Sequence, residues 1–411
     1  MKHLLEEFNI TKQRLKQLLL RNKLVASTIT LLTLLLVALY WSGVFDAPDP
    51  QGQVGAGWIK PVGSEVAYVG NATCQPCHPH EFQLYNASPH SRTVQMIPVG
   101  QERPEFVAAQ TVRDDRNGIL YSVRKGAGQN QIVATTGATS ETDTARWIFG
   151  SGNHAWTYLS QHGPQFRQLK ITYYPPSRTW NFTPGSGPGE GTAEALGDAY
   201  TPVQAAACFG CHSTVLTGTR KSLDLEHSRL NVGCESCHGP GRSHVESVQG
   251  GATANGTTAN GSQAAEAALV TPPLHNGPQI MQLCGLCHRM PVASGHENAL
   301  GETLLARFPG VALVRSRCFT ASAGKLSCIT CHNPHESTKE QQLSSFEAKC
   351  LSCHTAPHGK PCARGETTNC ITCHMPEEAI ARKIPLRFHN HWIRKNPFGM
   401  SQNPADIPHN S

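Results

Sequence analysis

The chain has 411 residues, of which 16% are charged and 39% are apolar, and its formal net charge is +6. A coiled coil is excluded because it needs more charged and helix-forming residues, and a polytopic membrane protein is excluded because only one long apolar run exists. The small net charge gives no reason to expect nucleic-acid binding. The apolar fraction is modest for a core of this size, so we expect something other than side chains to fill part of the interior.

The N-terminal segment predicts a membrane anchor. Residues 24–45 carry no charge over 22 positions, which is long enough for a helix to span a bilayer. Lys and Arg dominate the charges of residues 1–23, so this segment is expected in the cytoplasm and the rest of the chain outside it. A cleaved signal peptide is the alternative, but its apolar part is shorter and ends in small residues, unlike the Ala-Leu-Tyr-Trp of 38–41. The sequence therefore predicts a single-pass bacterial inner-membrane protein, with a linker at 46–66 and a periplasmic globular part.

Fourteen of the 16 cysteines fall in seven Cys-x-x-Cys-His motifs. This motif is typical of c-type haem attachment, in which the two thiols bind the vinyl groups of one porphyrin and the histidine binds its iron. Zinc sites and disulfide scaffolds are the alternatives, but neither requires a histidine directly after each cysteine pair. We therefore predict seven covalently attached haem c groups. The predicted attachment residues are Cys74, Cys77, Cys208, Cys211, Cys234, Cys237, Cys284, Cys287, Cys328, Cys331, Cys350, Cys353, Cys370 and Cys373. The predicted iron ligands within the motifs are His78, His212, His238, His288, His332, His354 and His374.

The other histidines can supply a second axial ligand to each iron. Apart from the motifs and His3, 13 histidines remain, whereas the whole chain has only 6 methionines. Ligation by two histidines is therefore expected at most irons, and the scarcity of methionine indicates low reduction potentials. The predicted second ligands are His90, His154, His244, His335, His358 and His391. Histidines expected at the surface, beside a ligand or in a structural role are His80, His162, His227, His275, His296, His389 and His409.

Residues 105–185, between the first and second motifs, contain the clearest strand patterns. The predicted strands are 119–124, 131–135, 166–174 and 178–182, with a hairpin between the last two. The other six motifs crowd into residues 208–374, so porphyrins rather than side chains are expected to form the core there, carried by short helices. We predict a mainly α fold with much irregular structure, organised around stacked haems, with a small β-rich subdomain at 105–185. Within the haem domain, 67–395, residues 249–268 are predicted as a flexible loop, and 396–411 as a C-terminal tail.

Two cysteines, Cys318 and Cys362, stand outside the motifs. In an oxidising compartment a disulfide between them is expected, and the alternative is two free or separately buried thiols.

Four blocks of the sequence together resemble the cytochrome c554-like multihaem family. They are 68–78 with the Ser-Pro-His of 88–90, then 233–244, 325–335, and 370–376 with 388–394. The likeness covers most of residues 66–395 and implies a periplasmic electron-transfer cytochrome with stacked haem pairs. The second iron ligands that it implies are His90, His244, His335 and His391. Cytochrome c554 itself holds four haems, so the likeness does not give the packing order of seven.

Three functions fit these observations. The first is an electron carrier between redox protein partners, the second a reductase or oxidase of small nitrogen or sulfur compounds, and the third a haem subunit of a larger respiratory complex. An enzyme needs an iron with an open position where substrate binds. Related pentahaem nitrite reductases often mark that haem with a lysine in place of the motif histidine, whereas all seven motifs here end in histidine. Electron transfer is therefore favoured, and an open iron, if one exists, is expected at the motif of 208–212 or that of 284–288.

Overall fold

The computed structural model describes residues 58–107, 110–187, 194–249, 276–289, 306–355, 362, 365, 367–380 and 384–395. The predicted cytoplasmic segment, the predicted anchor 24–45 and the C-terminal tail lie outside these residues, as do His358 and most of the predicted loop 249–268. In the described part of the chain, no helix is both long and apolar enough to cross a membrane. The described part of the chain therefore gives the predicted single-pass inner-membrane localisation no support.

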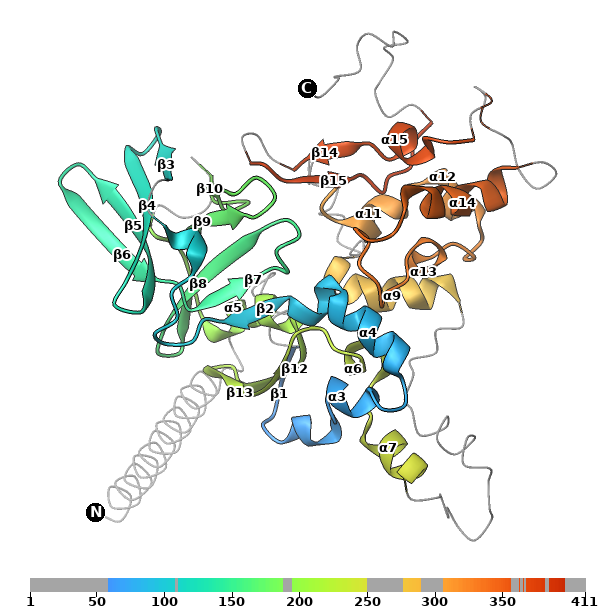
Figure 1. Cartoon of the computed structure of the whole chain (residues 1–411), viewed down its shortest axis with the longest axis horizontal. Helices are drawn as coiled ribbons and strands as arrows, with labels where there is room; N and C mark the ends of the chain where they lie inside the picture. The colour runs from blue at the N-terminus through green and yellow to red at the C-terminus, as the bar shows by residue number, and fades with distance from the viewer. Residues whose placement is uncertain are drawn as a thin grey trace, which may run out of the picture. The chain divides into compact units, whose positions relative to one another are not determined.

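Two antiparallel sheets dominate the described residues before the second motif. One has the strand order β3-β4-β5-β6, and the other has the order β10-β9-β8-β7-β2, with β11 also paired to β9 (Figure 1). Their strands are β2 (Val94–Met96), β3 (Thr111–Asp114), β4 (Ile119–Gly126), β5 (Gln129–Thr136), β6 (Thr139–Thr144), β7 (Trp147–Phe149), β8 (Trp156–His162), β9 (Gln165–Tyr174), β10 (Thr179–Phe182) and β11 (Gly197–Tyr200). The four predicted strands coincide with β4, β5, β9 and β10, and β9 and β10 form the predicted hairpin, so these predictions are confirmed.

The strands follow from alternating side chains and from turn chemistry. In β4, Ile119, Tyr121 and Val123 are buried, and the residues between them are less so. The β4–β5 turn is formed by Ala127 and Gly128, whose φ angles of 51° and 71° are both positive. A two-residue turn of this kind matches the twist of the strands that it joins. The largest buried apolar cluster of the described residues then forms between positions 97 and 196.

Strands also occur after the second motif, where the sequence predicts helices and loops. β1 (Ile59–Lys60), β12 (Ser213–Thr219) and β13 (Ser222–Leu230) form a three-stranded sheet, and β14 (Glu377–Ala379) pairs with β15 (Arg387–His389). The prediction of a mainly α fold is therefore wrong. The motif helices are only 4 to 12 residues long, and the backbone groups of the intervening segments find partners in hairpins instead.

Short helices carry the seven motifs. These helices are α3 (Asn71–Cys74), α5 (Pro202–Cys211), α6 (Glu235–His238), α9 (Gly277–His288), α13 (Cys328–Cys331), α14 (Leu343–His354) and α15 (Cys370–His374). α5 begins at a capping box in which Thr201 and Gln204 exchange hydrogen bonds, and it ends within the second motif. The other helices are η1 (Ser64–Ala67), α4 (Pro79–Ala87), η2 (Pro89–Arg92), η3 (Pro104–Phe106), α7 (Arg242–Gln249), α11 (Pro309–Leu313) and α12 (Arg317–Ala321).

Candidate haem centres

All seven Cys-x-x-Cys-His motifs lie among the described residues, and each has at least one cysteine in a helix. Two cysteines three positions apart on a helix lie on the same face, about one turn apart. Both thiols of such a motif can therefore reach one group, and in every motif except the first the histidine that follows lies at the end of the helix or directly after it. We number the seven candidate sites by the order of their motifs along the chain.

Three motif histidines each face a histidine from a distant part of the chain. The pairs are His90–His288 (6.2 Å between ring centroids, 71° between ring planes), His238–His335 (6.2 Å, 5°) and His332–His391 (6.1 Å, 35°). The structure thus brings three predicted second ligands opposite the motif histidines of the fourth, third and fifth sites.

The separation in these pairs fits an iron held between two imidazoles. A bond from a metal to an imidazole nitrogen is about 2.0–2.1 Å long and the ring centroid lies about 1.1 Å behind that nitrogen, so two ligands on opposite faces place their centroids roughly 6.3 Å apart. The three measured separations are 6.1–6.2 Å. Three pairs from unrelated segments therefore share the spacing that a common group between the rings would impose.

Backbone carbonyls orient four of the predicted ligand rings through Nδ1. These hydrogen bonds run from His90 to Pro334 O (3.3 Å), His212 to Thr93 O (2.8 Å), His374 to Arg394 O (2.6 Å) and His391 to His389 O (3.0 Å). A carbonyl oxygen can only accept, so the hydrogen is on Nδ1 and the lone pair of Nε2 is left for a metal.

Burial favours the neutral form of six of the predicted ligand histidines. It lowers the pKa of His288 and of His391 to about 4 each, and neighbouring histidines add to the effect. Burial also lowers the pKa of His90, His212, His238 and His332. A neutral imidazole is the form that binds a metal.

Apolar packing in the helical part also fits a bound porphyrin. The large buried clusters of the described residues lie between positions 94 and 216, whereas the described residues after position 276 contribute only to two small ones. Leu286 and Ile329, which lie between the cysteines of their motifs, keep 58% and 48% of their surface exposed. A flat apolar group attached at these motifs would cover such side chains and supply the missing core.

His154 lies in the neighbourhood of the seventh site. Its ring centroid is 4.7 Å from that of Phe388, and Glu377, three residues after the seventh motif, acts electrostatically on it. This position agrees with a role near His374 but does not by itself make a ligand pair.

His244 lies in the first turn of α7, close to the segment before the first motif. Arg242, in the same turn, donates a hydrogen bond from Nε to the Val66 carbonyl at 2.6 Å. The remaining predicted second ligand, His358, is outside the described residues.

A buried carboxylate that the sequence does not single out ties the third motif to the first. Glu235, between the cysteines of the third motif, is 5% exposed and accepts hydrogen bonds from the backbone N–H groups of Val69 (2.9 Å), Gly70 (2.9 Å) and Gly241 (2.7 Å). The Oδ1 atom of Asn71 accepts a further hydrogen bond from the Cys234 N–H at 2.9 Å. Most of these partners are far apart in the chain, so no local sequence pattern could have predicted these hydrogen bonds.

Cys318 and Cys362 are both free thiols, so the predicted disulfide between them is wrong. Cys318, on α12, interacts electrostatically with Cys331 of the fifth motif and Cys353 of the sixth, whereas Cys362 interacts with Cys370 of the seventh. The two thiols therefore lie beside different motifs, which explains why they do not pair.

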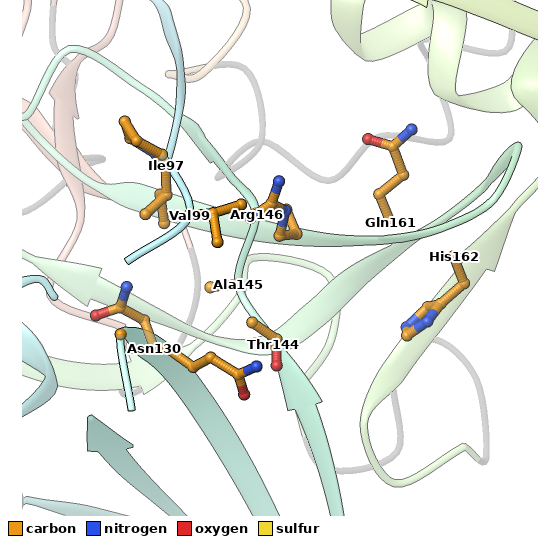
Figure 2. A pocket seen from close by; sticks show the side chains of 11 residues that line it. Ile97, Val99, Asn130, Thr144, Ala145, Arg146, Gln161 and His162 are labelled. Atoms are coloured by element: carbon orange, nitrogen blue, oxygen red, sulfur yellow. The ribbon is translucent and has the colours of Figure 1, made fainter. Parts of the chain in front are cut away.

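A cavity of about 290 Å³ lies in the β-rich part (Figure 2). Its wall includes the side chains of Arg146, Gln161 and His162, together with Ile97 and Val99. None of the attachment cysteines or predicted iron ligands lines it, so the chemistry that the motifs predict is located elsewhere.

Comparison with known proteins supports the chemistry of the motifs. The family model for cytochrome c554 and c-prime matches residues 189–239, which include the second and third motifs. A search of curated proteins finds no match. Among solved structures, the outer cell wall cytochrome OcwA is similar over 80% of each chain, with 12% sequence identity and a TM-score of 0.40, a likeness too distant to carry an argument. The family match agrees with the resemblance that the sequence itself shows.

Proposed function

We propose, starting from its membership of the c-type cytochromes, that this chain holds seven covalent haems and passes electrons along them between redox protein partners. The family implies covalent haem c and electron transfer, and the number seven rests on the seven complete motifs. The observation that carries the proposal is the common spacing of the three histidine pairs. A bound haem supplies an iron that gains and loses one electron.

In this proposal, the two cysteines of each motif form thioether bonds and the motif histidine binds one face of the iron. The second ligand is His335 at the third site, His90 at the fourth and His391 at the fifth. Each comes from a segment far from its motif, so iron binding also holds those segments together. Pairing with two nitrogens and no methionine sulfur keeps the reduction potentials low.

The remaining second ligands are assigned by neighbourhood. The hydrogen bond of Arg242 to Val66 favours the first site for His244, because η1 directly precedes the first motif. The proximity of Glu377 favours the seventh site for His154. His358 is retained as a second ligand on the sequence argument alone.

An iron with a histidine on each face has no position left for a substrate. The paired sites can therefore exchange electrons but cannot bind and convert a small molecule at the metal. This geometry favours a carrier over an enzyme at the third, fourth and fifth sites.

A second candidate function, a reductase of small nitrogen or sulfur compounds, is favoured by one observation at the second site. The ring neighbour of His212 is Phe149, at 5.0 Å between centroids, and none of the histidines that the structure describes faces it as in the three pairs. The fourth site, also expected to be open, has His90 opposite its motif histidine. Of the two sites at which an open iron is expected, Cys208–His212 is therefore the better candidate.

Intact mass and carbon monoxide binding test the proposal together. The carrier account predicts the mass of the chain plus seven haems, and negligible binding of carbon monoxide by the reduced protein. Fewer than seven haems would contradict the count. Binding of one carbon monoxide per chain, with turnover of nitrite or hydroxylamine, would favour the reductase instead.

A further inference from the structure

Attachment cysteines of different motifs lie near one another, and two of these approaches involve α9. Interaction with the Cys287 thiol of the fourth motif lowers the pKa of Cys211 in the second, and interaction with the Cys328 thiol of the fifth motif lowers the pKa of Cys284 in the fourth to about 7. The fourth motif is thus close to the second through one cysteine and to the fifth through the other.

Other contacts of α9 place the same motifs beside it. The Cys211 Sγ lies 3.9 Å from the Leu286 carbonyl, and the Cys328 Sγ lies 3.4 Å from the Met281 Sδ. α13, which carries the fifth motif, packs on α9. The neighbourhood of the fourth motif is therefore defined by helix packing and by distances as well as by the thiols.

The third site reaches the fourth through the second ligands. His90, opposite the fourth motif histidine, hydrogen-bonds through Nδ1 to the carbonyl of Pro334. Pro334 directly precedes His335, which faces His238 of the third motif. Burial, and to a smaller extent Cys284 of the fourth motif, raises the pKa of the Cys237 thiol in the third motif. The third site is thus a third neighbour of the fourth.

The other sites continue outward from these neighbours. The first motif lies beside the third through the Glu235 and Asn71 contacts described above. α13 packs on α14, and α14 packs on α15. Cys350 of the sixth motif interacts with Cys331 of the fifth and Cys370 of the seventh. The sites therefore follow the order 1-3-4-5-6-7, with the second site attached to the fourth.

We propose that the fourth site is a junction at which the electron path divides toward the second, third and fifth sites. The inference rests on the proposed function, because it needs haems at the motifs. Each attachment thiol becomes a thioether at the edge of its porphyrin. Attachment cysteines of neighbouring motifs therefore bring porphyrin edges together, and electron transfer is fastest between close edges. At each step one electron leaves a ferrous iron, which becomes ferric, and reduces a ferric neighbour to ferrous, without a change in bonds or protons.

The junction gives the path three ends, at the first, second and seventh sites. An electron that enters at any end must pass the fourth site to leave at either of the others. A linear path would instead give the fourth site two neighbours and the protein two ends.

The variant His90→Met tests the junction. Replacing one axial histidine by methionine raises the potential of the fourth haem, so that it is reduced before the others. A reduced low-spin haem is diamagnetic, and its magnetic interaction with neighbouring ferric haems then disappears. We expect the EPR signals of three other haems to change together when this one haem is reduced. The matched variant His391→Met, which acts on the fifth site, is expected to change the signals of two.

The experiment distinguishes failure of the junction from failure of the ligand pairing. A raised potential of one haem with changes in two signals or fewer would overturn the junction and leave the carrier function intact. Unchanged potentials of all haems would overturn the His90–His288 pairing on which both proposals depend. If His90→Met does not fold, the wild-type protein is poised at successive potentials and the responding signals are counted at each step. The junction requires one haem whose reduction alters three others, and a maximum of two would overturn it.

Discussion

The two nitrogens of each candidate ligand have separate tasks. In His90 and His391, Nδ1 donates to a backbone carbonyl, which fixes the ring and leaves the Nε2 lone pair for a metal. Burial keeps both imidazoles neutral. Ligand geometry is therefore set by the backbone before any metal binds, and removal of one ring should change one site.

Replacing His335 by glycine is expected to open the third site alone. The iron would keep His238 and lose the ring on its other face, so one haem becomes high-spin and the reduced protein binds one carbon monoxide per chain. The control is His227→Gly, because His227 is exposed and hydrogen-bonded to Asp224, and it should leave every haem signal unchanged. A low-spin spectrum in the His335→Gly variant identical to that of the wild type would contradict the pairing.

Glu235 should contribute to stability through the backbone groups that it satisfies. In Glu235→Ala three buried N–H groups lose a charged acceptor, so we expect the free energy of unfolding to fall by about 3 kcal/mol. The control is Glu246→Ala, since Glu246 is exposed and only 3.9 Å from Arg242 in an ion pair on α7, with an expected loss below about 0.5 kcal/mol. Denaturant unfolding measures the free energy of unfolding of both variants. Equal losses would show that the Glu235 carboxylate does not stabilise the fold through its backbone hydrogen bonds.

Residue identities at the sites could be predicted, but their partners could not. The Cys-x-x-Cys-His spacing is local, so the attachment cysteines and motif histidines are evident from the sequence. His90 and His288 face each other although they are nearly 200 residues apart in the sequence, and only the folded chain brings them together. Glu235 and Asn71 were missed for the same reason.

At the scale of helices and strands, the short turns decide which hairpins form. Ala127 and Gly128 both have positive φ, and the backbone of Gly100 lies against Gly128 so closely that a Cβ there would be 2.6 Å from the Gly100 Cα. In the β5–β6 turn, Gly137 has a φ of +58° and open space around it. The two glycines thus share a backbone conformation and differ in crowding.

This difference predicts unequal effects of the same substitution. Gly128→Ala adds a methyl group against backbone that cannot rotate away, and we expect a loss of about 2–3 kcal/mol in the free energy of unfolding. Gly137→Ala adds only the strain of positive φ, about 1 kcal/mol. Thermal unfolding of the two variants gives the comparison, and a larger loss for Gly137→Ala would refute the steric argument.

Elements with an internal pattern were predictable, and those stabilised by distant partners were not. β4 and β10 alternate buried and less buried residues, whereas β5 and β9 contain runs of buried residues within longer strands, and both patterns are visible in a sequence. β14 and β15 have three residues each, too few to show a period. The mainly α prediction failed because it assigned such segments to loops.

At the scale of the whole molecule, the described residues divide into a part with its own apolar core and a part without one. The large buried clusters lie between positions 94 and 216, and the described residues after position 276 contribute only to small ones. We therefore expect the second part to depend on haem for its interior, in line with the modest apolar content of the sequence.

Chain produced without haem attachment should fold in part. We expect limited proteolysis to leave a resistant fragment that contains residues 94–216 and to digest residues 276–395, because only the first has sufficient apolar burial. Mass spectrometry of the fragments, beside the haem-loaded protein as control, measures the difference. Equal resistance of both parts in the haem-free chain would show that side chains alone build the second core.

The central claim, that histidine pairs close the irons so that the protein carries electrons, is tested most directly by EPR of the fully oxidised protein at helium temperature. The account predicts low-spin ferric signals that integrate to seven haems per chain, which requires a second ligand at every iron, the second site included. A high-spin ferric signal of one haem or more per chain would contradict it.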